Sequence, residues 1–188
     1  MRSILPMLIL AVTTSVPALA DAQTLPVPNF RSVELRGGGD LVIVPGPVQR
    51  VTIVEGSTQF TSVRMRQDEQ LQIDACNARC PHNYRLRVRI ESPRMPSVAV
   101  DAGGTIVAGR GFAPQHEVAA AVSAGGTIDL RAVDAERVVA AVHAGGDIYA
   151  RPRASLTAAV SGGGDIHYWG NPAVTMAVNG GGDVRRED

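Results

Sequence analysis

Carboxylates and glycines recur at regular spacing in the second half of this 188-residue chain, in a pattern that could bind a metal ion. A Gly-Gly pair followed by Asp or Thr and then by Ile or Val occurs five times. The pairs begin at positions 103, 125, 145, 163 and 181, which gives steps of 22, 20, 18 and 18 residues. Glycine beside aspartate is typical of calcium-binding β-rolls, whose period is roughly nine residues.

The carboxylates are too sparse for a stack of calcium sites. Calcium takes about six to eight oxygen ligands, whereas each phrase supplies one carboxylate at most. Two of the five phrases carry Thr105 or Thr127 in place of aspartate. The Asp or Thr is therefore interpreted as a residue that caps a corner through local hydrogen bonds, and no metal site or cofactor is predicted.

The glycine pairs are expected to form sharp corners, because a side chain at positive φ would clash there. Replacing Gly145 or Gly163 by Val is therefore expected to damage folding rather than a specific activity. The predicted corner glycines are Gly103, Gly104, Gly125, Gly126, Gly145, Gly146, Gly163, Gly164, Gly181 and Gly182.

The chain has two cysteines, Cys76 and Cys80, with Asp74 and His82 close by. A metal or haem site is one interpretation of this group. However, the Cys-x3-Cys-Pro-His spacing differs from the haem attachment pattern, and a second pair of zinc ligands is missing. In an exported protein a local disulfide between Cys76 and Cys80 is the stronger prediction.

The histidines do not form a catalytic arrangement. His82, His116, His143 and His167 fall in different columns or loops. His143 and His167 are expected to point outward, each without an Asp or Ser partner at fixed spacing. They are interpreted as solvated surface residues. Neither a Ser-His-Asp nor a Cys-His arrangement is found, so no catalytic residue is predicted.

Arginines suggest one binding surface. Arg85, Arg87 and Arg89 alternate with apolar residues and so share one face of a predicted strand. With Arg64 and Arg66 on a nearby strand they would form a basic stripe for an anionic ligand such as an envelope glycan. The alternative is a solvated face balanced by nearby acids. The formal net charge of +0 gives no support for nucleic-acid binding.

The elements that would position these residues are β-strands. Apolar residues alternate with polar ones from Phe30 onward, between clusters of Gly, Pro and Asn, which predicts an all-β protein. The five phrases predict a right-handed parallel β-helix, or β-solenoid, with rungs of about 18–22 residues. An outward stripe of alanines is either a plain exposed face or a surface for self-association: Ala99, Ala121, Ala141, Ala159 and Ala177.

The chain begins with an export signal. A positive start, an apolar run over residues 4–12 and the small residues before Asp21 predict a signal peptide at 1–20, with cleavage after 22 as the alternative. Residues 21–29 are interpreted as a linker and 30–188 as one β-helical domain. We expect no transmembrane segment in the mature chain and a location in the periplasm, at the cell surface or outside the cell.

The sequence resembles a known bacterial family. Phe30 to Val33, the strand ending at Ile73 and the step from Ile90 to Pro93 lead into the repeated glycine phrases. In this it is similar to the "putative autotransporter adhesin head, GIN domain" family, over roughly residues 30–184. The resemblance implies an exported right-handed β-helical domain, in a family of unknown function without an assigned enzyme activity or known site residues.

These observations favour an exported, non-enzymatic β-solenoid that acts as an adhesin, a ligand-binding module or a cell-envelope scaffold. Its partner is left open, with envelope glycan and self-association as the candidates. One alternative is a carbohydrate-active β-helix enzyme that acts on acidic polysaccharide. A calcium- or metal-binding module is the weaker alternative.

Overall fold

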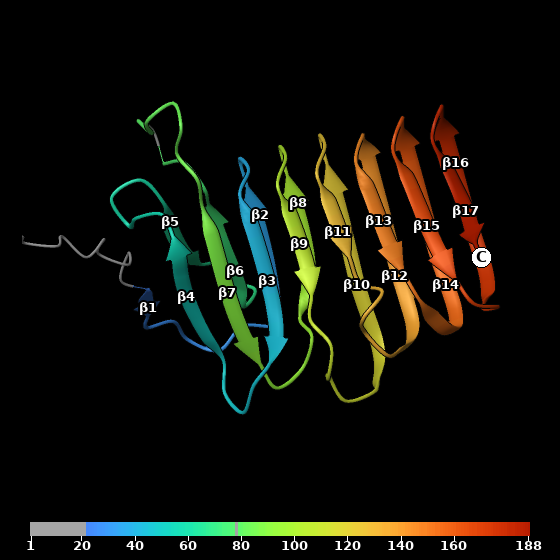
Figure 1. The fold of residues 1–188 in the computed structure, drawn as a ribbon. Coiled ribbons are helices and arrows are strands. Elements are labelled where there is room, and N and C mark those ends of the chain that lie inside the picture. Colours follow the sequence, from blue (N-terminus) through green and yellow to red (C-terminus); the bar gives the residue numbers. More distant parts are fainter. Residues whose placement is uncertain (1–21, 78) are drawn as a thin grey trace, which may run out of the picture.

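The protein folds into two β-sheets that enclose one hydrophobic core, as seen in a computed structural model that describes residues 22–77 and 79–188 (Figure 1). The predicted signal peptide lies outside the described residues. Within them the secondary structure consists of strands, which confirms the all-β prediction. None of the described residues form a helix that could cross a membrane.

The first sheet has nine strands. In spatial order they are β1 (Gln23–Leu25), β4 (Arg50–Glu55), β7 (Arg87–Ser92), β3 (Asp40–Pro45), β9 (Thr105–Ala108), β11 (Thr127–Asp129), β13 (Asp147–Ala150), β15 (Asp165–Trp169) and β17 (Asp183–Glu187).

The second sheet has eight strands. In spatial order they are β16 (Ala173–Gly180), β14 (Pro152–Gly162), β12 (Ala135–Ala144), β10 (Gln115–Ser123), β8 (Ser97–Asp101), β2 (Ser32–Arg36), β6 (Gln70–Asp74) and β5 (Ser62–Met65).

Parallel pairing in register organises the C-terminal part of both sheets. Ile128 lies opposite Ile106 and Ile148, and Ile148 lies opposite Ile166. All four side chains are fully buried between the sheets. In the second sheet Val122 and Val142 are opposite each other and equally buried. Burying these aliphatic positions fixes the register, because a slip of one residue would turn every one of them toward water.

The prediction of a right-handed parallel β-helix with regular rungs is wrong. Each sheet is mixed: β1 with β4, β4 with β7 and β5 with β6 pair antiparallel. Strand order also departs from chain order, since β7 lies between β4 and β3, and β2 lies between β6 and β8. The cause is the segment between β3 and β8, which lacks the glycine phrase and turns back on itself through β4 to β7. The segment 21–29, expected to be a linker, contributes β1 to the first sheet.

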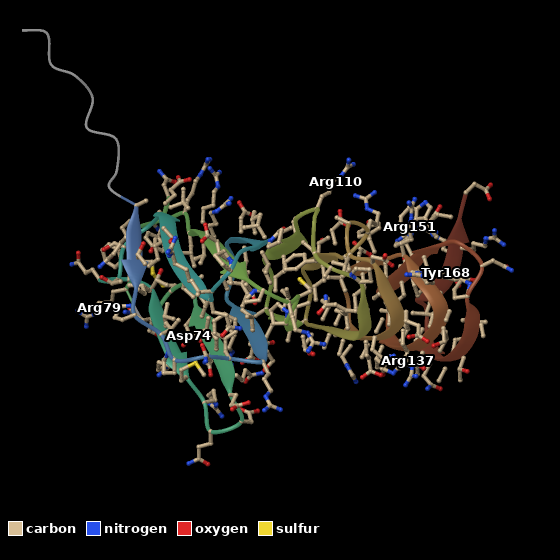
Figure 2. All side chains as sticks on the ribbon, turned by 90° about the horizontal axis from the view of Figure 1, so that it is seen from below. Asp74, Arg79, Arg110, Arg137, Arg151 and Tyr168 are labelled. Atoms are coloured by element: carbon tan, nitrogen blue, oxygen red, sulfur yellow. A yellow bond between two sulfur atoms is a disulfide. The ribbon has the colours of Figure 1, made fainter. Side chains whose placement is uncertain are left out.

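The two sheets present opposite outer faces to the surroundings. In Figure 2 Arg151, which follows β13, lies on one side, and Asp74 and Arg137, from β6 and β12, lie on the other. Residues that alternate with the buried ones point outward from each sheet. Any site on the strands is therefore built from every second residue, taken across neighbouring strands.

Candidate functional site

Chemically distinctive side chains gather on the outside of β11, β13, β15 and β17. The core position of each strand is aliphatic, so the residues on either side of it point away from the core. In-register pairing places these outward residues in columns across the four strands. We call this set the outer face: Asp129, Arg131, Asp147, Tyr149, Asp165, His167, Trp169, Asp183, Arg185 and Glu187.

Three ring systems stand together on this face. Tyr149 lies opposite His167 in the strand pairing, and their rings stack at 4.6 Å between centroids with an interplanar angle of 12°. Trp169, the single tryptophan of the chain, has its ring centroid 6.3 Å from that of Tyr149. The Arg131 guanidinium lies 5.5 Å from the Tyr149 ring centroid and 5.3 Å from that of Trp169. Such cation–π contacts attract the guanidinium to the rings.

Asp129 fixes the position of Arg131. The Arg131 Nε lies 3.0 and 3.1 Å from the two carboxylate oxygens, and its backbone N–H donates to Oδ1 at 3.0 Å. Burial alone would raise the pKa of Asp129, but the hydrogen bonds from Arg131 outweigh it and hold the pKa below its ordinary value. The same carboxylate raises the pKa of Arg131. Burial raises the pKa of Tyr149 above its ordinary value, and the nearby carboxylate of Asp147 acts in the same direction.

Three aspartates form a column beside the rings. Asp147, Asp165 and Asp183 lie opposite one another on β13, β15 and β17. Asp165 Oδ1 accepts a hydrogen bond from the backbone N–H of Asp183 at 2.9 Å. The ion pairs found within the described residues involve none of these three carboxylates. The column is therefore an uncompensated negative edge of the outer face.

His167 is the buried member of the face, with 7% of its side chain exposed. Its Nδ1 lies 2.7 Å from Oε1 of Glu187 and 3.2 Å from Nε of Arg185. The hydrogen bond from His167 lowers the pKa of Glu187, as does the nearby guanidinium of Arg185. The interpretation of His167 as a solvated surface residue is therefore wrong.

The predicted basic stripe is not brought together. Arg64 lies on β5 and Arg66 just after it in the eight-stranded sheet, whereas Arg87 and Arg89 lie on β7 in the nine-stranded sheet, with Arg85 just before. Nearby acids and amides also engage them. Arg64 pairs with Asp74, Arg66 donates to Gln72 at 3.2 Å, Arg87 lies 3.6 Å from Glu55 and Arg89 lies 3.6 Å from Glu91.

The two cysteines form the predicted disulfide. The bond takes up both sulfur atoms, so they are not thiolate ligands for a metal beside Asp74 and His82. The Cys76–Cys80 ring lies in the connection between β6 and β7. It is far in the strand order from the outer face, at the antiparallel end of the molecule.

The outer face escaped the sequence prediction although its signal was present. The 18-residue step between the last phrases places Tyr149 beside His167 and Asp147 beside Asp165. Reading the columns after the glycines as well as before them would have shown this grouping. The alanine column, by contrast, is where the sequence placed it: Ala121 lies opposite Ala99 and Ala141 on the outside of the eight-stranded sheet.

Comparison with known proteins connects part of this fold to a family. A family model described as "Putative auto-transporter adhesin, head GIN domain" matches residues 97–172. No curated protein matches the chain.

Several solved structures match this chain at low sequence identity and with TM-scores below 0.5. The crystal structure of a putative adhesin from Bacteroides fragilis is 16% identical, with 89% of this chain and 96% of that chain covered and a TM-score of 0.47. A putative adhesin from Parabacteroides merdae is 15% identical, with 89% and 96% covered and a TM-score of 0.43. A putative cell adhesion protein from Clostridium sporogenes is 9% identical, with 89% and 100% covered and a TM-score of 0.40. The resemblance of this sequence to the adhesin head GIN domain family is thus confirmed, by the family match, over residues 97–172.

Proposed function

We propose that this protein is an exported, non-enzymatic binding module of the adhesin type, and that its outer face holds a sugar chain of the cell envelope. The observation that carries the proposal is the position of Arg131 across Tyr149 and Trp169, at 5.5 and 5.3 Å from the ring centroids. This arrangement gives a preorganised ridge of flat side chains, in which Arg131 and His167 pack on the Tyr149 ring and charged groups lie along the sides. The family match over residues 97–172 supports the adhesin assignment, and this segment contains the ridge.

The chemistry of the ridge suits a carbohydrate. One side of a pyranose ring presents C–H groups, which pack against an aromatic face, while its hydroxyls need hydrogen-bond partners at the rim. Tyr149 and Trp169 each combine an apolar body with a polar tip, as residues at binding surfaces commonly do. Asp129 and Arg185 supply acceptors and donors beside the rings. Both rings lie on paired strands, so little ordering is required on binding.

The same face contains the best case for the enzymatic alternative, because Asp147 and Asp165 are neighbouring carboxylates. Glycoside hydrolysis uses two carboxyl groups, one of which must be protonated to donate to the leaving oxygen. Here both carboxylates lie in one column on a sheet face, on the same side of any sugar ring bound there. They do not flank a scissile bond, which is why we infer binding without cleavage.

A binding assay with neutral polysaccharides and soluble peptidoglycan fragments tests the proposal, and an acidic polysaccharide serves as the comparison, because the outer face carries more carboxylates than arginines. Tyr149→Ala and Arg131→Ala are expected to weaken retention by about tenfold or more, as loss of an aromatic or arginine anchor does. Tyr149→Phe keeps the ring and should bind normally. Arg137→Ala removes an exposed arginine from the other sheet and serves as the matched control.

Three results would overturn the proposal. Shortened chains in the assay would show an enzyme. Equal weakening by Arg137→Ala would show nonspecific charge attraction, and unchanged binding by Arg131→Ala and Tyr149→Ala would place the site elsewhere.

Export is tested separately, by fractionating cells that express the full chain. We expect the mature protein outside the cytoplasm, with Asp21 or Gln23 as its first residue. A full-length protein retained in the cytoplasm would contradict this part of the proposal and leave the binding assay unaffected.

A further inference from the structure

We propose that Asp147, Asp165 and His167 bind one divalent transition-metal ion, with zinc as the ion that fits best. One carboxylate oxygen from each aspartate and one ring nitrogen of His167 lie within 4.8 Å of one another. A single ion can bridge atoms at such separations after small side-chain rotations. The inference concerns a metal centre and does not depend on whether the outer face binds sugar.

The strand register creates this grouping. Asp147 and Asp165 are direct partners on the parallel strands β13 and β15. His167 follows Asp165 by two residues, so its side chain leaves the same side of β15. The buried pair Ile148 and Ile166 lies between these positions and locks the register from the core side. The three ligands are therefore held by backbone pairing rather than by a loop.

Electrostatics favours a cation at this point. Like charges directly opposite each other on neighbouring strands are destabilising. No arginine or histidine forms an ion pair with Asp147 or Asp165 within the described residues. The backbone N–H of Asp183 donates a hydrogen bond to Oδ1 of Asp165, which leaves Oδ2 of Asp165 to coordinate the ion. A divalent ion would offset the repulsion between the two carboxylates.

The second and independent observation is the state of His167. Its side chain is 7% exposed, and its Nδ1 lies 2.7 Å from Oε1 of Glu187. A carboxylate oxygen only accepts, so this contact requires the proton on Nδ1. The Nε–H of Arg185, which lies 3.2 Å from Nδ1, then donates to Oε1 of Glu187 at 3.1 Å instead. In the neutral imidazole Nε2 then carries the lone pair, and no hydrogen bond to Nε2 is found from the residues that the structure describes. A carboxylate behind one nitrogen and a vacant lone pair on the other is the usual environment of a metal-binding histidine.

The donor set selects the kind of ion. Imidazole suits zinc, copper, iron and nickel, whereas calcium and magnesium prefer oxygen ligands alone. Three protein ligands from nitrogen and carboxylate oxygen leave a fourth position for water or for a ligand oxygen, as in open zinc sites. The equivalent positions on the neighbouring strands β11 and β17 do not repeat this combination of two aspartates and a histidine. Thr127 replaces the aspartate on β11, and Arg185 replaces the histidine on β17.

The experiment titrates zinc into the tag-free mature chain by calorimetry, with calcium as the comparison ion. We expect one zinc per chain and at least tenfold weaker binding of calcium. Cobalt in place of zinc should give visible absorption bands of a nitrogen-containing site. Thermal unfolding should shift upward with zinc, because an ion that binds only the folded chain stabilises it.

Two substitutions decide the assignment. Asp147→Asn keeps size and shape and should weaken zinc binding at least tenfold, whereas Asp183→Asn changes the same column one strand further on and should leave it within about threefold. Glu187→Gln leaves the ligands in place and should weaken zinc about 10- to 100-fold by no longer holding the Nδ1 proton. This positioning role also predicts a changed cobalt spectrum.

The proposal is overturned if zinc does not bind, if Asp147→Asn binds zinc like the unmodified protein, or if Asp183→Asn weakens it equally, which would indicate a diffuse acidic edge. His116→Asn is the control for zinc binding by an exposed histidine, because His116 lies on the surface and pairs with Glu136. Loss of binding in His116→Asn alone would move the metal away from the outer face and refute the assignment.

Discussion

Gly164 lies against the backbone of Gly146 on the neighbouring strand turn, so closely that a Cβ atom built at Gly164 would lie 2.3 Å from the Gly146 carbonyl oxygen. The same Cβ atom would lie 2.5 Å from Cγ1 of Val142 and 2.9 Å from the carbonyl carbon of Gly145. The second glycine of the preceding pair repeats the relationship, because a Cβ at Gly146 would lie 2.5 Å from the Gly126 carbonyl oxygen. The second glycine of each pair is thus the one without space for a side chain.

Gly164→Ala should therefore lower the free energy of unfolding by about 2 kcal/mol or more, since a backbone oxygen cannot move aside as a side chain can. Gly163→Ala is the matched control, because its nearest neighbour would be the Ala144 carbonyl oxygen at 3.7 Å. That variant should change stability by less than about 1 kcal/mol. Denaturant unfolding measures both, and equal losses would contradict the steric argument.

The expectation that Val at Gly145 or Gly163 damages folding has no steric support in this structure. A Cβ at Gly145 meets nothing within 4 Å, and neither glycine has a positive φ. The sequence showed two glycines in each phrase but could not show which of them faces the neighbouring turn. That distinction depends on how the strands stack.

Replacing Gln115 by an apolar residue should stabilise the folded protein. It is 7% exposed, and its Nε2 has no hydrogen-bond partner among the described residues. A buried donor without a partner costs about 1–3 kcal/mol, so Gln115→Met should raise the free energy of unfolding by about 1 kcal/mol. Gln72 is the control, because it is 2% exposed but donates to Asp74 at 2.8 Å. Gln72→Met should be destabilising. A higher free energy of unfolding in both variants would show that the hydrogen bonding of the buried side-chain amide does not decide the effect.

The sequence predicts which side of a strand is buried better than it predicts the neighbour of that strand. Val88 and Ile90 alternate with charged residues and are fully buried, as are Leu41 and Ile43 at the same spacing of two. Alternation contains no information on strand direction, so the insertion of β7 between β3 and β4 could not be read from it. The basic stripe failed for this reason, since Arg64 and Arg87 were assumed to share a face.

The outer face was within reach of the sequence only in part. Phrases spaced by 18 residues imply that Tyr149 and His167 are neighbours. The flat stacking of their rings and the hydrogen bond from His167 to Glu187 depend on side-chain rotamers, which spacing does not determine. A histidine cannot be recognised as buried without knowing what covers it.

Asp74 should make stability depend on pH in the acid range. Burial would raise the pKa of Asp74, but hydrogen bonds from Gln72, Arg64 and Ser62 outweigh it and hold the pKa below the ordinary value of 3.8. Because the folded-state pKa is the lower one, the stabilisation is complete above 3.8 and is lost as pH falls through the folded-state value. Asp74→Asn should therefore be destabilising near neutral pH, with a deficit that shrinks in acid.

Urea unfolding of the unmodified protein and Asp74→Asn, from about pH 7 to about pH 2, measures this difference. Asp68→Asn in the exposed turn before β6 is the control and should show no such pH-dependent deficit. A deficit for Asp74→Asn that stays constant down to the lowest pH would show that the carboxylate charge is not the cause.

The disulfide should contribute little to overall stability and more to the shape of its loop. It closes a ring across a sequence separation of 4, for which the chain-entropy model gives about 2 kcal/mol at most. Other contacts already fix this region. The backbone N–H of Asn77 donates to Phe60 at 2.7 Å, and the Tyr84 hydroxyl accepts from the Ser57 N–H at 2.9 Å.

The double variant Cys76→Ser/Cys80→Ser should therefore fold and melt a few degrees lower, and reductant should lower the melting temperature of the unmodified protein but not of the variant. Amide exchange should rise at Asn77 and stay unchanged at Ile148 in the core of the other end. Failure of the variant to fold would mean that the ring, rather than the hydrogen bonds from Asn77 and Tyr84, holds the β6–β7 connection in place.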